Sequence, residues 1–228
     1  PCDVMSKKLG IVTIGQSPRT DVVPEMTPFL GDGVEIVERG ALDGLTLNEV
    51  EECHPEHGMA HLVSRMRDGT EVVVAKEKLL PRIERAIEDL DSQRVSAILL
   101  LCLGDFPRFR SSCLLVEAQR IVDRCVDGLV GETDHLGILI PIPEQEAWVR
   151  NTFSRMTPQI TVADASPYAD RDRLSRAGAM LSEANCDLIL MYCMGFNRRA
   201  AGDIRRVTGK PVVLSSSLVA RTLGELLE

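Results

Sequence analysis

VSAILLLCLG, at residues 95–104, has a counterpart in CDLILMYCMG, at residues 186–195. Each stretch is a short, continuously apolar run without polar alternation, which is typical of a strand buried on both faces. Near its carboxyl end each carries a cysteine, Cys102 or Cys193, followed by one residue and then a glycine, Gly104 or Gly195. Ligands of open parallel α/β sheets bind beyond the carboxyl ends of the strands. The two cysteines are therefore candidate catalytic residues.

The surroundings of the two stretches also repeat. LGILIP at residues 136–141 is similar to LGIVTI at residues 9–14, and strands alternate with helices after both, which indicates a parallel sheet in each half. Gly10 and Cys102 are 92 positions apart, whereas Gly137 and Cys193 are 56 apart, so the first half carries about 36 extra residues. We predict an α/β fold of two pseudo-symmetric halves with mainly parallel sheets, residues 5–130 and 131–228. The C-terminal helix, 217–227, is able to pack back on the first half.

Local patterns place the remaining elements. The expected strands are 9–14, 34–37, 70–75, 159–163 and 211–214, in addition to the two cysteine strands and 136–141. The expected helices are 22–30, a short one within 45–52, 76–90, one from near 112 toward 125, 145–156, 171–184, 199–207 and 217–227. Residues 1–4 have the character of a tail.

Composition excludes several classes of protein. With 44% apolar residues the chain can form a core, yet no run approaches the roughly 18 apolar residues of a spanning helix. No signal peptide opens the sequence, so we expect a soluble, cytoplasmic protein without a membrane partner. The net charge of −8 argues against a nucleic-acid partner.

The cysteine pattern favours reduced thiols. Seven cysteines are an odd number, and no C-x-x-C motif supports a zinc ribbon or a thioredoxin-type site. Cys113, Cys125 and Cys186 are expected to be packing residues, and Cys2 lies in the tail. A cysteine that closes an apolar strand is itself often a small buried apolar residue, but two at matched positions of matched halves favour a paired role.

The turn after the first strand is a candidate anion site. Gly15, Gln16, Ser17 and Arg19 lie between a buried strand and a helix start, where free backbone amides attract anions. We expect Arg19 to grip a carboxylate through two charge-assisted hydrogen bonds. The alternative is that Ser17 or Thr20 merely caps the helix and that Arg19 is solvated.

Three of the four histidines lie close to a cysteine, in CHPEHGMAH at residues 53–61. His57 and His61 have the i, i+4 spacing that can share a metal on a helix. Pro55 and Gly58 favour a turn instead, so polar residues on a loop are the alternative. We predict no metal and no cofactor for the protein.

Longer motifs carry a family resemblance. TIGQSPR at 13–19, CMGF at 193–196 and LSSSLVAR at 214–221 resemble the AroM family over nearly the whole chain. The tandem halves, each with a cysteine after a buried strand, resemble the aspartate/glutamate/hydantoin racemase superfamily, which also includes maleate isomerases and arylmalonate decarboxylases. The resemblance implies an Asp/Glu racemase-like fold.

The resemblance also implies a function. Two thiols that face each other across a carbon acid can remove a proton from one face and return one to the other, which inverts the centre without a cofactor. We therefore expect an isomerase or racemase of a small carboxylate that uses Cys102 and Cys193. The alternatives are a carboxylate-binding or regulatory protein of the same fold, or a lyase or decarboxylase that uses one cysteine. A homodimer is a possible assembly.

The chain departs from the racemase pattern beside both cysteines. Such racemases usually continue the first cysteine with Asn-Thr and the second with Thr-His, whereas this chain has Leu103-Gly104 and Met194-Gly195. Gly104 and Gly195 would offer backbone amides to the substrate instead. Ser215, Ser216 and Ser217, with Arg221, are further candidates for the anion site.

Overall fold

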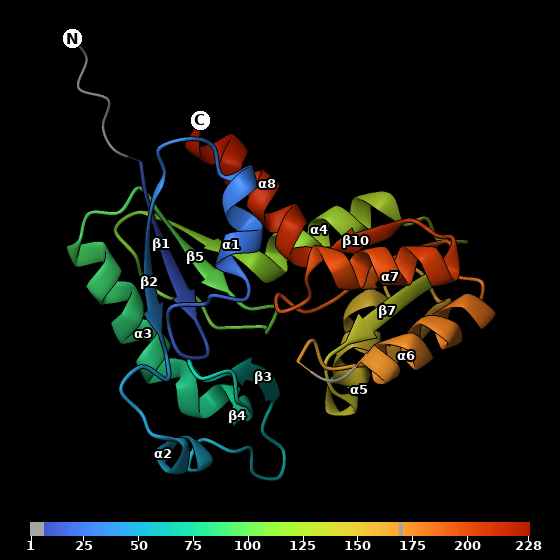
Figure 1. Ribbon diagram of the computed structural model, residues 1–228, viewed down its shortest axis with the longest axis horizontal. Coiled ribbons are helices and arrows are strands. Elements are labelled where there is room, and N and C mark those ends of the chain that lie inside the picture. Colours follow the sequence, from blue (N-terminus) through green and yellow to red (C-terminus); the bar gives the residue numbers. More distant parts are fainter. Residues whose placement is uncertain (1–6, 169–170) are drawn as a thin grey trace.

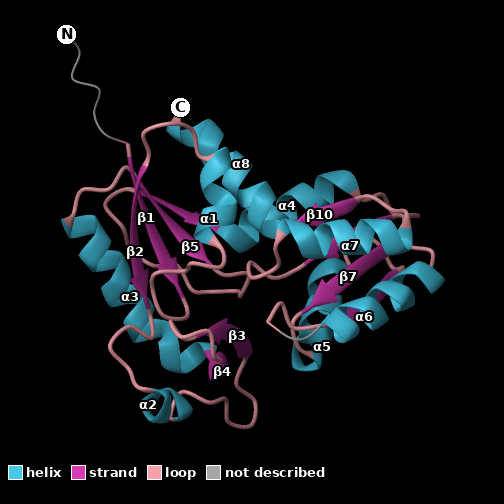
Figure 2. Ribbon diagram, viewed as in Figure 1, coloured by secondary structure: helices cyan, strands magenta, loops and turns pink. Residues whose placement is uncertain are grey.

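The computed structural model describes residues 7–168 and 171–228, so the predicted tail, Cys2 and the predicted boundary at residue 5 lie outside the described residues. The chain forms two four-stranded parallel sheets, each flanked by helices (Figure 2). The first contains β1 (Lys8–Thr13), β2 (Glu35–Gly40), β5 (Ala97–Leu101) and β6 (Leu114–Glu117) in the order β2-β1-β5-β6. The second contains β7 (Leu136–Ile140), β8 (Ile160–Asp164), β9 (Leu188–Met191) and β10 (Val212–Leu214) in the order β10-β9-β7-β8.

The two sheets have the same topology. The first strand of each half pairs with the second on one side and with the cysteine strand on the other, so β1 corresponds to β7 and β5 to β9. All five residues of β5 are buried, as are all five of β7, which explains the apolar runs without alternation. The predicted pair of pseudo-symmetric α/β halves is confirmed.

Helices cover the sheets (Figure 1). They are α1 (Val23–Met26), α3 (Lys76–Ser92), α4 (Ala118–Leu129), α5 (Glu146–Phe153), α6 (Arg171–Glu183), α7 (Arg198–Thr208) and α8 (Ser215–Leu227), with 3-10 turns η1 (Thr27–Phe29) and η2 (Pro143–Gln145). None of the described helices is long and apolar enough to cross a bilayer. The predicted helix 22–30 is wrong as a single helix, because Pro28 interrupts it and the chain continues as η1.

The last helix returns to the first half. In Figure 1, α8 lies beside α1 and α4, and it packs against both. Gly224 is required at this contact, since a Cβ there would lie 2.1 Å from the carbonyl oxygen of Phe29. One apolar cluster therefore runs through both halves, from Leu9 on β1 to Leu190 on β9.

The extra residues of the first half form a small layer of their own. Between β2 and α3 lie α2 (Leu47–Glu51) and an antiparallel hairpin of β3 (His61–Arg65) and β4 (Glu71–Ala75). The sequence predicted β4 but not β3, and it merged β6 into the helix expected from residue 112. The hairpin reaches the second half, where the Ser166 hydroxyl donates to the Glu71 carboxylate.

Candidate active site

Both predicted cysteines line a single cavity of about 210 Å³. Cys102 directly follows β5, and Cys193 lies two residues beyond the end of β9, so the corresponding strands of the two halves deliver one thiol each. Cys102 is 8% exposed, whereas Cys193 is partly exposed. The two thiols thus line the same cavity, and their action as a catalytic pair stays a prediction.

The cavity lies between the halves and is lined from both. The first half contributes the turn after β1, the segment 59–63 at the start of the hairpin, Lys76 and residues 101–105. The second half contributes Pro141, Glu144, Gln145, Trp148, Tyr168 and residues 192–195. Gln145 Nε2 donates to the carbonyl oxygen of His61 over 2.9 Å, which joins the halves at one wall.

In each Cys-x-Gly turn, the backbone amide of the glycine donates a hydrogen bond to the cysteine sulfur. The backbone amide of Gly104 donates to Cys102 Sγ at 3.4 Å, and the amide of Gly195 likewise bonds Cys193. The amides that we expected to bind substrate are therefore directed at the thiols. Amide donors favour a thiolate, which is the nucleophilic and basic form of cysteine.

Burial has a larger effect on the pKa of each thiol than the amide donors have. It raises the pKa of Cys102 to about 12 from its ordinary 9.0, against the lowering effect of the Gly104 amide. Burial also raises the pKa of Cys193 to about 11, against the Gly195 amide and the charge of Arg19. A negative charge on Cys193 would raise the pKa of Cys102 further. Without a ligand, both groups are neutral thiols near pH 7.

Arg19 lies at the cavity wall and is 4% exposed, so it is not solvated. Its Nε and Nη2 donate to the two carboxylate oxygens of Asp21 at 2.8 and 2.7 Å. Nη1 donates to Thr13 Oγ1 at 2.9 Å, and Nη2 also donates to the Tyr168 hydroxyl at 2.8 Å. Burial lowers the pKa of Arg19, but the hydrogen bond and charge of Asp21 raise it more, so the guanidinium stays charged.

This geometry corrects the expected role of Arg19. The fork that was to hold a substrate carboxylate already holds Asp21, and four of the five guanidinium protons have acceptors among the described residues. One Nη1 proton remains. Arg19 is thus mainly a positioning residue that brings positive charge to Cys193 and anchors Tyr168.

Tyr168 is a cavity residue that the sequence reasoning missed. It follows β8 in the loop of the second half, and its hydroxyl oxygen accepts from Arg19 while the guanidinium of Arg65 lies 5.7 Å from the ring centre. A Cβ on Gly195 would lie 2.7 Å from the Tyr168 hydroxyl and 2.9 Å from Pro167. The glycine of the second Cys-x-Gly motif therefore makes room for Tyr168.

Tyr192, which precedes Cys193, forms another wall. It is 1% exposed, and its hydroxyl donates to Asp123 Oδ1 on α4 at 2.7 Å. Its ring lies 5.7 Å from that of Trp148, centre to centre. Burial raises the pKa of Asp123, whereas the Tyr192 hydroxyl lowers it. The α4 helix of the first half thereby holds the cysteine turn of the second.

Several predicted binding residues do not line the cavity. Gln16 Nε2 donates to the carbonyls of Leu42 and Leu45, and the Ser17 hydroxyl donates to Asp43 at 2.6 Å. Both side chains therefore hold the inserted segment in place. Gly15 provides close packing, since a Cβ there would lie 2.3 Å from the Ser64 hydroxyl.

The serines after β10 have structural contacts as well. The Ser215 and Ser216 hydroxyls donate to the carbonyls of Met191 and Phe196. Ser217 is half-buried on α8, and Arg221 lies over the Phe29 ring at 4.3 Å. Ser215 and Ser216 therefore hold the backbone at and just after the end of β9. Of the predicted substrate-binding residues, Arg19, Gly104 and Gly195 line the cavity.

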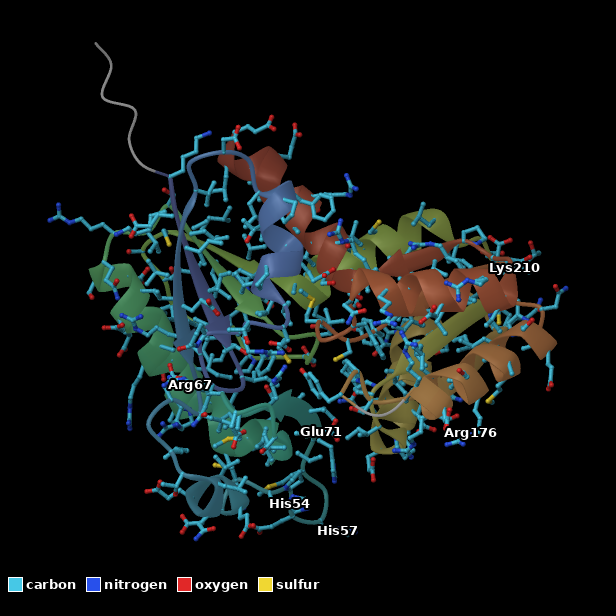
Figure 3. The ribbon with its side chains drawn as sticks, viewed as in Figure 1. His54, His57, Arg67, Glu71, Arg176 and Lys210 are labelled. Atoms are coloured by element: carbon cyan, nitrogen blue, oxygen red, sulfur yellow. The ribbon has the colours of Figure 1, made fainter. Side chains whose placement is uncertain are left out.

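The histidine segment is divided between the surface and the cavity. His54 and His57 are exposed beside α2 (Figure 3), whereas His61 begins β3 and lines the cavity. Its Nδ1 lies 3.1 Å from the carbonyl of Met59. Across residues 7–168 and 171–228, no cluster of three or more His, Cys, Asp or Glu side chains is arranged to hold a metal ion.

Three further cavity residues escaped the sequence reasoning. Lys76 begins α3 and donates to the carbonyl of Asp105 at 2.9 Å, while Trp148 lies on α5. His61 was considered as a metal ligand or loop residue, not as part of the cysteine site. Sharing a cavity wall depends on tertiary packing, and no local motif signals it.

Solved structures with this fold are known. Allantoin racemase from Pseudomonas fluorescens is 13% identical over 96% of this chain and 90% of that one, with a TM-score of 0.61. A mutant of arylmalonate decarboxylase is 15% identical over 96% and 93%, with a TM-score of 0.61. Aspartate racemase from Picrophilus torridus is 13% identical over 97% and 94%, with a TM-score of 0.60.

These likenesses confirm an Asp/Glu racemase-like fold. No curated protein matches the chain. The family model described as AroM protein matches residues 9–227, which is nearly the whole sequence, and the chain belongs to the AroM family.

Proposed function

We propose that the protein is a cofactor-independent isomerase or racemase of a small carboxylate, in which Cys102 and Cys193 act as acid and base. The observation that carries this proposal is the meeting of the two thiols in one cavity, each delivered by the corresponding strand of its half. The similarity in fold to racemases supports it.

The chemistry requires one thiolate and one thiol. The thiolate takes the proton from the carbon next to the carboxylate, which leaves a carbanion stabilised as an enediolate. The opposite thiol then protonates the other face. The two sulfurs exchange protonation states, and no atom other than hydrogen is transferred. Cys193 is the better resting base, because its pKa is raised to about 11, whereas that of Cys102 is raised to about 12.

The developing negative charge needs donors on the cavity wall. The hydroxyl of Tyr168 accepts from Arg19, so its own proton can be directed toward a substrate oxygen. The remaining Nη1 proton of Arg19 is a second donor. Donors aimed at charge that appears in the transition state are among the strongest catalytic contributions. We propose that these two groups, with Lys76, which also lines the cavity, hold the carboxylate.

Proton exchange with solvent tests the proposal. Candidate carboxylic acids are incubated with the protein in D₂O, and loss of the α-proton signal is followed by NMR. We expect at least one acid to exchange, and the Cys102→Ser/Cys193→Ser variant to be inactive. Equal exchange by parent and double variant would remove the proposal.

A one-thiol decarboxylase is the second candidate. The cysteines have unequal surroundings, since Cys193 is partly exposed whereas Cys102 is 8% exposed. The similarity in fold to arylmalonate decarboxylase fits this reaction. Release of CO₂ that depends on one cysteine and not on the other would favour it.

A binding protein without turnover is the third candidate. Both thiols are neutral at rest, and the residues that follow them, Leu103 and Met194, are apolar. Stabilisation of the protein by a carboxylate, with no product and with unchanged binding in the double cysteine variant, would favour this reading.

A further inference from the structure

We infer that the substrate is a carboxylic acid whose reacting carbon carries an apolar substituent about the size of a six-membered ring. This inference rests on the proposed function and names the substrate class of that site. It is carried by three properties of the cavity: the chemistry of its wall, its volume and the positions of its charges.

The wall is largely apolar. Side chains of this kind come from both halves of the chain, and they include Ile14, Met59, Leu62, Val63, Pro141 and Trp148. Trp148 is half-buried, and its ring leans on Tyr192 with an angle of 33° between the planes. A flat aromatic surface at the wall favours a flat or ring-shaped apolar partner.

The volume matches a ring with a small polar group. Apolar cavities of about 150 Å³ in proteins accept benzene. The cavity here is about 210 Å³, so a ring leaves room for a carboxylate beside the cysteines. Acetate or propionate would fill only part of this space and would leave the contacts with Trp148 and Met59 unmade.

The charges argue against an amino acid. An α-ammonium group in the cavity would need a carboxylate or another acceptor, because an unpaired buried charge is costly. Among the described residues, the acidic side chains that line the cavity are those of Asp105 and Glu144, and both are exposed to solvent. Asp21, which is more deeply placed, is already paired with Arg19. The cation Lys76 and the remaining Nη1 proton of Arg19 complement an acid without an amino group.

The single tryptophan makes a direct test practical. Because Trp148 is the only tryptophan of the chain and lines the cavity, its fluorescence reports ligand binding. Phenylacetate, cyclohexylacetate, acetate and phenylalanine are titrated into the full-length parent protein, with calorimetry as a second readout. We expect both ring-bearing acids to bind at least tenfold more tightly than acetate, and phenylalanine to bind at least tenfold more weakly than phenylacetate.

Variants locate the effect. Trp148→Leu should lose most of the preference for phenylacetate over acetate, as measured by calorimetry. Phe109→Leu is the matched control, since Phe109 is a half-buried aromatic residue outside the cavity lining, and it should keep the preference. Should Trp148→Leu fold poorly, protection of Cys193 in the parent against iodoacetamide gives an independent measure, and phenylacetate should protect at lower concentration than acetate.

The outcomes separate this inference from the proposed function. A ring preference without proton exchange would leave the substrate class standing and remove the isomerase. Proton exchange of acetate-sized acids without any ring preference would support the isomerase and remove the proposed substrate class. Absence of phenylacetate binding, or tighter binding of phenylalanine, would overturn the inference.

Discussion

The guanidinium of Arg19 donates a 2.8 Å hydrogen bond to the hydroxyl of Tyr168, a residue 149 positions away in the other half of the chain. The bond closes the cavity wall next to Cys193 and connects the buried Arg19–Asp21 pair to a side chain that can touch substrate. Arg19 thereby links the packing of the cavity wall to the positive charge near both thiols.

Tyr168→Phe should weaken binding of phenylacetate by about tenfold. The phenol supplies a hydrogen bond to a charged group, which contributes roughly 1.5–3 kcal/mol. The affinity is measured by Trp148 fluorescence. Tyr192→Phe is the control, because its hydroxyl donates to Asp123 and is not available to the ligand. A tenfold loss in Tyr192→Phe with none in Tyr168→Phe would contradict the assignment.

Arg19→Met should lower the free energy of unfolding by about 3 kcal/mol, because the largely buried carboxylate of Asp21 would keep only the more distant Arg65, at 3.8 Å, as a cationic partner. For a chain of this length, such a loss corresponds to a fall in Tm of roughly 6–12 °C. Asp21→Asn should have a similar effect, and the double variant should recover part of the loss. Additive effects in a double-mutant cycle would show that the pair is not coupled.

The same pair produces an acid sensitivity. Burial raises the pKa of Asp21, but Arg19 lowers it more, so the folded-state pKa lies below the usual 3.8. The stabilisation is therefore present above about pH 4 and is lost as the pH falls through the lowered pKa. Urea unfolding between pH 2 and 6 should show a steeper loss of stability for the parent than for Asp21→Asn. The same pH dependence of unfolding free energy in the parent and in Asp21→Asn would contradict a stabilising Arg19–Asp21 ion pair.

Alkylation should report neutral thiols. The iodoacetamide rate at Cys193 should be slow at pH 7 and should rise with pH toward about 11, whereas the rate at Cys102 should continue to rise toward about 12. The same cysteines in the denatured protein are the control. Because the base must be a thiolate, kcat/KM should also rise by about tenfold per pH unit over the neutral range. Rapid alkylation of Cys102 or Cys193 in the folded protein at pH 7 would instead indicate a thiolate at rest.

Gly195→Ala should displace Tyr168 and lower stability by about 1–3 kcal/mol, since the new methyl group would overlap the phenol and Pro167. Phenylacetate binding should weaken with it. Gly202→Ala is a matched control, because a Cβ at Gly202 in α7 meets no atom within 4 Å, and Ala should stabilise the helix by about 0.5–1 kcal/mol. Equal behaviour of the two variants in thermal unfolding would contradict the close packing.

The repeated apolar strands made the overall fold predictable. β5 and β9 lack polar alternation, so their burial and the position of the cysteines beyond them could be read from the sequence. β3 was not predictable in this way, because His61 and Ser64 are polar and the strand gains its burial from pairing with β4. In β6, Leu114 to Glu117 continue without a break into α4, so local periodicity could not separate strand from helix.

The positions of the two thiols and the nearness of Arg19 could be predicted from the sequence. The hydrogen-bond partners of Arg19 could not. Spacing along the chain does not show that Asp21, two residues on, takes its fork, nor that Tyr168 comes from the other half. Trp148 has no motif at all, and only the docking of α5 places it at the cavity. Contacts between distant segments decide these roles.

The most direct measurement follows each enantiomer of an exchanging acid in D₂O with the parent, Cys102→Ser and Cys193→Ser. The account predicts that the parent inverts both enantiomers with one solvent deuteron incorporated, and that each single variant loses inversion by 100-fold or more, in line with the typical contribution of roughly 10²–10⁴ from a positioned acid or base. Inversion at the parent rate by either single variant would contradict the two-thiol mechanism.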